Sequence, residues 1–254
     1  MSVLKNAINA LDPAPDKKTE LTLALSLLSE LCEQKVREFS SAIENELRVA
    51  GTVESKTVPV TEILARHKEY RAYVRSDAGK IATEVSSAIK KFISGGTDDI
   101  IDGIASLVTT GIEAIIGAGS GVQQEMSSYY IVVQDYGIAR YDVRVWVRQI
   151  EATGITTQIE TALASVAFKS SVDISKLTFN TFLIAYGSQL QAMNFPKDKQ
   201  TEYLDYAIAI YNKLRGETSA GSITNNTTSQ ALMATPSSSL YFKLPAQFYG
   251  SLWD

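Results

Sequence analysis

The chain has 254 residues, of which 45% are hydrophobic and 20% charged, with a net charge of −4. These values are typical of a folded globular protein and exclude global disorder, and the length allows one large domain or two small ones. The acidic balance argues against a nucleic-acid partner, because such partners are usually bound through an excess of Lys and Arg. Cys32 is the only cysteine, which excludes an internal disulfide and a thiolate metal cluster.

The first fifty residues predict two helices. Residues 1–11 form a short amphipathic helix that stops at Pro13, and no long apolar core of a secretory signal is present. We therefore expect a cytoplasmic protein, or one released without a cleaved signal peptide. Residues 18–50 form a long helix that ends at Gly51, and its leucine-rich first half is expected to be the more deeply buried half.

Two further helices are expected, one over residues 61–76 and one that follows it and carries Ile81 to Phe92. The first is predicted from apolar residues three and four positions apart, among them Ile63 and Tyr70, and the second from the same spacing at Ile81, Val85 and Ile89. A break at residues 94–96 follows.

Residues 97–121 are the most apolar stretch of the chain and predict a helix with clear ends. Thr97 is a good N-cap, two aspartates follow it where the helix dipole favours acids, and glycines close the stretch. Apolar residues three and four positions apart form one helical stripe: Ile101, Ile104, Val108, Ile112 and Ile115. Together with Ile100 and Ile116 they make up the candidate membrane segment. The flanking glycines are candidate hinges: Gly95, Gly96, Gly117, Gly119 and Gly121.

This helix has two interpretations. Its length of about 30 Å matches a bilayer core, but Asp102 and Glu113 lie within it, and an ionised acid at mid-membrane costs on the order of a few kcal/mol. It is therefore either a core helix whose small residues permit close packing, or a segment stored in the fold and released to a membrane, with the two acids as a charge brake. The high content of glycine and short polar residues gives weight to the second interpretation.

The pattern changes period after residue 121. Residues 129–133 are rich in β-formers, and residues 140–150 alternate polar and apolar side chains as a half-buried strand does. A turn at residues 135–137 would join them as a hairpin. The arginines at positions 140, 144 and 148 also fit a helix, and the valines favour the strand. We expect these arginines on a solvated strand face, while contacts with bases or lipid headgroups are the alternatives.

The rest of the folded part is expected to be helical. Residues 155–168 slightly favour a helix, Asp173 is expected to cap a helix that runs to Met193, and Pro196 opens another that ends at Gly216. Residues 217–239 are a Ser/Thr/Asn-rich linker. The aromatic carboxyl-terminal segment, residues 240–254, docks on the body, binds another subunit or meets a membrane interface through Tyr241, Phe242, Phe248, Tyr249 and Trp253.

No catalytic or metal-binding motif is present in the sequence. His67 is the single histidine and lies at an apolar helical position, so a structural role is expected. The acids at positions 98, 99 and 102 do not have the spacing of a calcium loop, and helix capping explains them more simply. We expect no enzyme activity, no metal and no cofactor.

These observations predict a predominantly helical α+β fold with one short hairpin. Residues 1–216 would form a single globular domain, followed by the linker and the aromatic segment. Long helices around a glycine-rich apolar segment resemble the plan of α-helical pore-forming toxins, over about 25 residues and without a shared motif. The resemblance implies a membrane-active, virulence-type protein with a lipid membrane as partner. The alternative is a non-enzymatic module that forms homo-oligomers through its aromatic segment.

Overall fold

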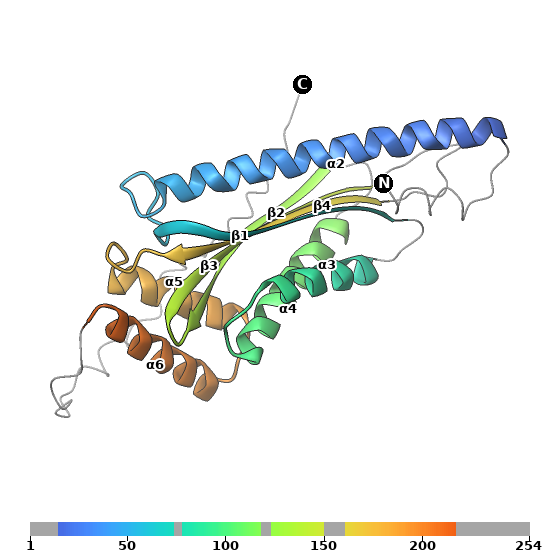
Figure 1. Cartoon of the computed structure of the whole chain (residues 1–254). Coiled ribbons are helices and arrows are strands. Elements are labelled where there is room, and N and C mark those ends of the chain that lie inside the picture. Colours follow the sequence, from blue (N-terminus) through green and yellow to red (C-terminus); the bar gives the residue numbers. More distant parts are fainter. Residues whose placement is uncertain (1–14, 74–77, 118–122, 150–160, 217–254) are drawn as a thin grey trace, which may run out of the picture.

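The computed structural model describes residues 15–73, 78–117, 123–149 and 161–216. A four-stranded antiparallel sheet lies between one long helix on one face and four shorter helices on the other (Figure 1). The helices are α2 (Pro15–Val49), α3 (Ala78–Phe92), α4 (Asp98–Gly117), α5 (Phe179–Ala192) and α6 (Lys197–Leu214). The strands are β1 (Val60–Tyr73), β2 (Gln123–Gln134), β3 (Gly137–Gln149) and β4 (Thr161–Val172), in the spatial order β1-β4-β3-β2.

The predicted fold class is wrong in its balance. The described chain is an even α+β mixture, about 54% helix and 29% strand, and its sheet extends well beyond one short hairpin. Two segments predicted as helices are strands, namely residues 61–76, which contain most of β1, and residues 155–168, whose described part lies in β4. β4 is buried on both faces, so its side chains show no alternation from which a strand could be recognised. β1 pairs with β4, which lies about a hundred residues later in the chain at Val60 and Val172, so a local sequence pattern does not indicate this pairing.

Helix α2 covers one face of the sheet, but its burial is the reverse of the expected one. The second half of the helix supplies the buried seam, with Phe39 and Ile43 against Trp146 and Phe168 of the sheet. Two leucines of the first half point to solvent, with Leu23 61% and Leu27 58% exposed, whereas Leu28 and Leu31 pack against the seam in part. The amino-terminal end of α2 projects past the described part of the sheet in Figure 1, so the sheet does not cover Leu23 and Leu27. A glycine at φ +79°, Gly51, follows the helix as predicted.

The hairpin of β2 and β3 is confirmed, with its turn at residues 135–136. Strand β3 is not half-buried, however, because both of its faces are covered. Val143, Val145 and Val147 face the helices α3 to α6, while Arg140 and Trp146 lie buried on the side of α2. Single-strand periodicity cannot distinguish a solvated polar face from a polar face beneath a helix.

The two edges of the sheet are protected in different ways. Edge strand β1 has two register irregularities, between Val60 and Glu62 and between Ile63 and Ala65, and carries many charged side chains. Bulges and charges both oppose pairing with another strand. At the other edge, the side-chain amide of Gln189 on α5 accepts from the N–H of Ile131 at 2.7 Å and donates to its C=O at 2.9 Å. A glutamine thus takes the place of a fifth strand at this point of β2.

Two helices of the second layer end close to the predicted positions. Helix α3 ends at Phe92, and α6 (Lys197–Leu214) follows Pro196 and stops two residues before the positive-φ glycine Gly216. Asp173 does not cap the long helix as expected; its carboxylate accepts from Ser175 and the backbone of Lys176, and α5 begins six residues later with Thr178 as its N-cap. The short helix of residues 1–11, the linker and the aromatic segment 240–254 lie outside the described residues.

Candidate functional site

Helix α4 is the apolar helix predicted over residues 97–121. Six of its 20 residues are buried, all from the candidate membrane segment: Ile100, Ile104, Val108, Ile112, Ile115 and Ile116. The seventh residue of that segment, Ile101, belongs to the predicted stripe and is only partly buried. The helix packs against α3 and against strands β2 and β3, so it lies in an outer layer and not in the middle of a bundle. Within the described residues it is the one helix long and apolar enough to cross a membrane.

Helices α3 and α4 form an antiparallel hairpin whose turn is fastened to the sheet. The Tyr141 hydroxyl accepts from the Ser94 N–H at 3.1 Å and donates to the Ser94 C=O at 2.9 Å. The Gln134 side chain donates to the same carbonyl at 2.7 Å, and its amide lies where a Cβ on Gly95 would stand. With φ +90° at Gly95, this turn has one defined conformation in the folded protein.

The glycines inside α4 have a packing role. A Cβ on Gly103 would lie 2.7 Å from the sulfur of Met193, and a Cβ on Gly111 would lie 2.3 Å from the sulfur of Met126. The two methionines therefore approach the helix backbone where a side chain is missing, as the core-helix interpretation expects. Of the predicted hinge residues, Gly95 and Gly96 lie in the fastened turn and Gly117 ends the helix, while Gly119 and Gly121 lie outside the described residues.

The solvent face of α4 is short and weakly polar. Both predicted brake residues, Asp102 and Glu113, are exposed on it, and Asp102 forms an ion pair with Lys90 of α3. Between them this face carries only Ser, Thr, Ala, Gly and one partly buried Leu. Removal of the charges of Asp102 and Glu113 would thus leave a helix with no ionised side chain between Ile100 and Gly117.

Two tyrosines of α6 bind the start of α4 and the turn between strands β2 and β3. Tyr203 donates to the Asp99 carboxylate at 2.5 Å, and Tyr206 donates to the Asp135 carboxylate at 2.7 Å. These hydrogen bonds raise the pKa of each phenol to about 12, because the phenolate would face a carboxylate. The sequence carried no signal for either pair, since the partners are distant along the chain.

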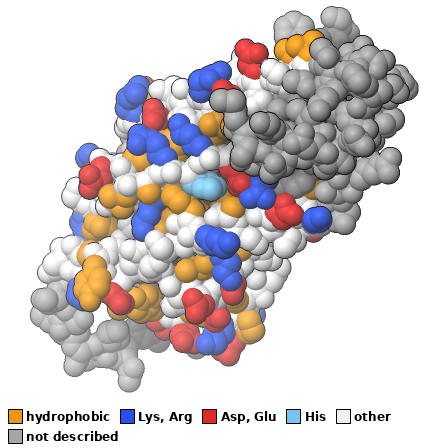
Figure 2. Space-filling view, turned by 45° about the vertical axis from the view of Figure 1, so that its right-hand side comes forward, with side chains coloured by type: hydrophobic (Ala, Val, Ile, Leu, Met, Phe, Trp, Pro, Cys, Tyr) orange, Lys and Arg blue, Asp and Glu red, His pale blue; other side chains and the backbone are white. Residues whose placement is uncertain are grey.

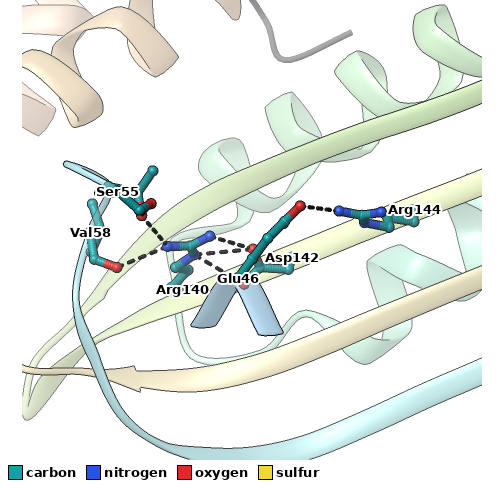
Figure 3. A network of polar contacts seen from close by, with 7 residues as sticks. Glu46, Ser55, Val58, Arg140, Asp142 and Arg144 are labelled. Atoms are coloured by element: carbon teal, nitrogen blue, oxygen red, sulfur yellow. Dashed lines mark hydrogen bonds and ion pairs between the residues drawn. The ribbon is translucent and has the colours of Figure 1, made fainter. Parts of the chain in front are cut away.

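A second polar cluster lies between α2 and the sheet (Figure 3). The Arg140 guanidinium donates to the Asp142 carboxylate at 2.6 to 3.1 Å and to the Val58 carbonyl at 2.9 Å, and stacks on Tyr129 at 4.3 Å. The side chains of Arg140 and Asp142 are only 3% and 6% exposed. Beside them, Arg144 pairs with Glu46 of α2.

This cluster ties three parts of the chain together: α2, the loop after it, and strand β3. The prediction of a solvated arginine face is wrong for Arg140, which is buried on the same side of the strand as Trp146 and cannot reach a base or a lipid headgroup. Burial raises the pKa of Asp142, with Arg140 acting in the opposite direction. The spacing of Arg140 and Asp142, two residues apart on a strand, predicts that both lie on one face of the sheet. It does not predict that a helix covers this face.

His67 lies on strand β1, not on a helix as predicted. Its ring packs 5.7 Å from the ring of Phe92, and its Nε2 lies 3.7 Å from the Glu69 carboxylate without a hydrogen bond among the described residues. Figure 2 shows the single histidine at the surface among side chains of both charge signs. On the described part of this face, Lys and Arg side chains are interspersed with Asp and Glu.

Reactive and metal-binding groups are sparse in the part of the chain that the structure describes. Burial raises the pKa of Cys32 to about 11, so its thiol is neutral and poorly nucleophilic at neutral pH. No group of three or more His, Cys, Asp or Glu side chains that could hold a metal ion occurs among the described residues. In comparisons with known proteins, no protein-family model, no curated protein and no solved structure matches the chain.

Proposed function

We propose that the protein acts on membranes, and that the α3–α4 hairpin is the part that leaves the sheet and enters a bilayer. The observation that carries the proposal is the position of α4, a helix of membrane-spanning length and apolarity with only six buried residues in an outer layer. An apolar helix that a soluble protein needs only for its core is usually buried on most sides.

Helix α3 is suited to accompany α4. One face carries Ile81, Ala82, Val85 and Ile89, all fully buried, and the other carries Lys90 and Lys91 in the last turn. A helix with one apolar and one basic face lies in the plane of a membrane interface, its lysines at headgroup level. We therefore expect α3 on the membrane surface and α4 across or within the bilayer.

A reversible crosslink between α4 and its neighbour tests this proposal. A Cβ at position 103 would lie 2.9 Å from Cγ of Met193, the place that a cysteine sulfur takes at position 193. In a disulfide, each Cβ lies about 3 Å from the partner sulfur, so Gly103→Cys with Met193→Cys is a pair suited to a crosslink. Cys32 is buried and protonated and does not compete for this bond.

The assay is release of a trapped dye from phosphatidylcholine vesicles, with and without phosphatidylglycerol. The oxidised double variant should not release dye, and the same preparation after reduction should release it as the unsubstituted protein does. Equal release by the oxidised and reduced forms would show that α4 does not leave the fold. Absence of release by the unsubstituted protein at every pH would end the proposal.

The charge brake predicts how release depends on pH. Protonation of carboxylates at acid pH removes the Asp102–Lys90 ion pair and the cost of placing ionised acids in the bilayer. Release should therefore quicken as pH falls, and Asp102→Asn with Glu113→Gln should bring the fast rate to neutral pH. Because both side chains are exposed, the substitutions leave the fold intact; a variant with an unchanged pH profile would contradict the brake.

A second candidate function is self-assembly without enzyme activity. Leu23 and Leu27 lie one turn apart on the projecting end of α2, and both are exposed. Paired helices bury such leucines between subunits. The double variant Leu23→Glu, Leu27→Glu should then lower the mass measured by light scattering, whereas removal of residues 240–254 tests the aromatic segment separately. An unchanged mass in both variants would reject this candidate.

A further inference from the structure

A pocket of about 560 Å³ opens between the loop after β4 and the last turns of α6. Residues 175–179 form one wall, and Tyr211, Asn212 and Arg215 form the other. The volume lies in the range of cavities that hold small organic ligands, about 300 to 1,000 Å³. The pocket is remote in the chain from the α3–α4 hairpin, and the proposed membrane activity makes no use of it.

The charge of the pocket is positive and comes mainly from Arg215. One of its terminal nitrogens donates to the carbonyls of Ile174 and Ser175, each at 3.1 Å, which fixes the guanidinium over the loop. No acidic residue of the described chain pairs with Arg215. The other cation, Lys176, is already paired with Asp173 at 3.0 Å, so Arg215 holds the charge that remains without a counter-ion.

The remaining walls are aromatic and amide. Phe179 is 42% exposed, and its ring packs at a tilt, 5.4 Å from the ring of Tyr211. The Tyr211 hydroxyl donates to the Leu177 carbonyl at 2.7 Å, which fixes the Tyr211 ring. The side-chain amide of Asn212 has no partner among the described residues. An exposed aromatic ring, an unused amide and an unneutralised guanidinium thus line one cavity.

We propose that this pocket binds a small organic anion with a phosphate or carboxylate group attached to an aromatic ring. The free nitrogens of Arg215 would hold the anion, because a guanidinium fork matches the geometry of both groups. The Asn212 amide would donate to a further oxygen of the anion. The ring of the ligand would lie against Phe179, which gives the pocket a preference for aromatic anions over inorganic ones.

Isothermal titration calorimetry of the full chain with model compounds tests the proposal. The probes are phenyl phosphate, benzoate, inorganic phosphate and phenol. At least one of the two aromatic anions should bind saturably. Inorganic phosphate lacks the ring and phenol lacks the anionic group, so each should bind at least about fivefold more weakly than that anion. No saturable binding of either aromatic anion would overturn the proposal.

Three variants locate the binding. Arg215→Gln should weaken the tighter aromatic anion about tenfold. Since this change also removes the bonds to two loop carbonyls, Asn212→Asp provides an independent test: it keeps the shape, adds a negative charge beside the anion and should weaken it similarly. Lys213→Gln removes an equal charge from α6 outside the lining and should have little effect. Binding that survives Asn212→Asp, or that falls as far with Lys213→Gln as with Arg215→Gln, would overturn the assignment.

Discussion

The buried Arg140–Asp142 pair gives the sharpest prediction about stability. In Asp142→Ala, the guanidinium of Arg140 loses the one carboxylate with which it pairs among the described residues, and it stays beneath α2, where its side chain is 3% exposed. Removal of one partner from a buried ion pair costs about 3 to 5 kcal/mol, because the other charge is left uncompensated. In a domain of this size, each kcal/mol lowers the melting temperature by roughly 2 to 4 °C. We therefore expect Asp142→Ala to melt some 6 to 20 °C lower, as ~3 to 5 kcal/mol implies.

The measurement is urea unfolding followed by circular dichroism, with thermal melting as a second readout. Glu46→Gln is the matched control, since Glu46 pairs with Arg144 in the same cluster but its side chain is 53% exposed. Exposed pairs contribute about 0 to 1 kcal/mol, so this variant should unfold almost as the unsubstituted protein does. The double variant Arg140→Met, Asp142→Leu should be more stable than Asp142→Ala, because no unpaired charge remains. Equal losses in Asp142→Ala and Glu46→Gln would refute the reasoning.

Three further predictions concern single polar contacts. Gln189→Leu should cost about 1 to 3 kcal/mol and speed hydrogen exchange at the Ile131 amide, because the edge of β2 loses both bonds; unchanged exchange would contradict the edge-sealing role. Tyr203 has a pKa raised to about 12, so its contribution is complete below pH 10 and is lost as the pH rises from about 10 to 12; in Tyr203→Phe the alkaline loss of stability should be smaller. Hydrogen bonds from Ser175 and Lys176 lower the pKa of Asp173. Ionised Asp173 therefore stabilises the fold above about pH 4, and this stabilisation is lost as the pH falls further. In Asp173→Asn, the melting temperature should thus fall less steeply at acid pH.

The sequence predicted those elements whose ends carry local chemistry. Acids before residue 100 and glycines after residue 116 bounded α4, and Pro196 with Gly216 bounded α6. The hairpin turn at residues 135–136 was equally local. Each of these signals acts within a few residues, so a single sequence contains it entirely.

The elements that were missed depend on partners elsewhere in the chain. Strand β1 is a strand because β4 lies beside it, with Val60 opposite Val172, and its own spacing of apolar residues fits a helix as well. The burial of Arg140 depends on where α2 crosses the sheet, as does the exposure of Leu23. Likewise, the role of Gly103 became visible only with Met193 against it. Close packing against Met193 explains why position 103 is a glycine, so this glycine does not by itself indicate a weak helix.

The same packing sets the conditions under which α4 could leave the sheet. Six buried apolar side chains at about 1.5 to 3 kcal/mol each amount to about 9 to 18 kcal/mol, as much as the whole stability of a typical domain. Release into water would therefore unfold the protein. A bilayer recovers most of this burial, since its interior is as apolar as the face that α4 leaves. Two costs remain: the apolar face of the sheet that α4 would uncover, and the polar contacts, namely the bonds at Ser94 and Asp99 and the charges of Asp102 and Glu113. Protonation acts on the carboxylates and leaves the apolar contacts unchanged, so under the proposed membrane activity the hairpin should enter a bilayer faster at acid pH than at neutral pH.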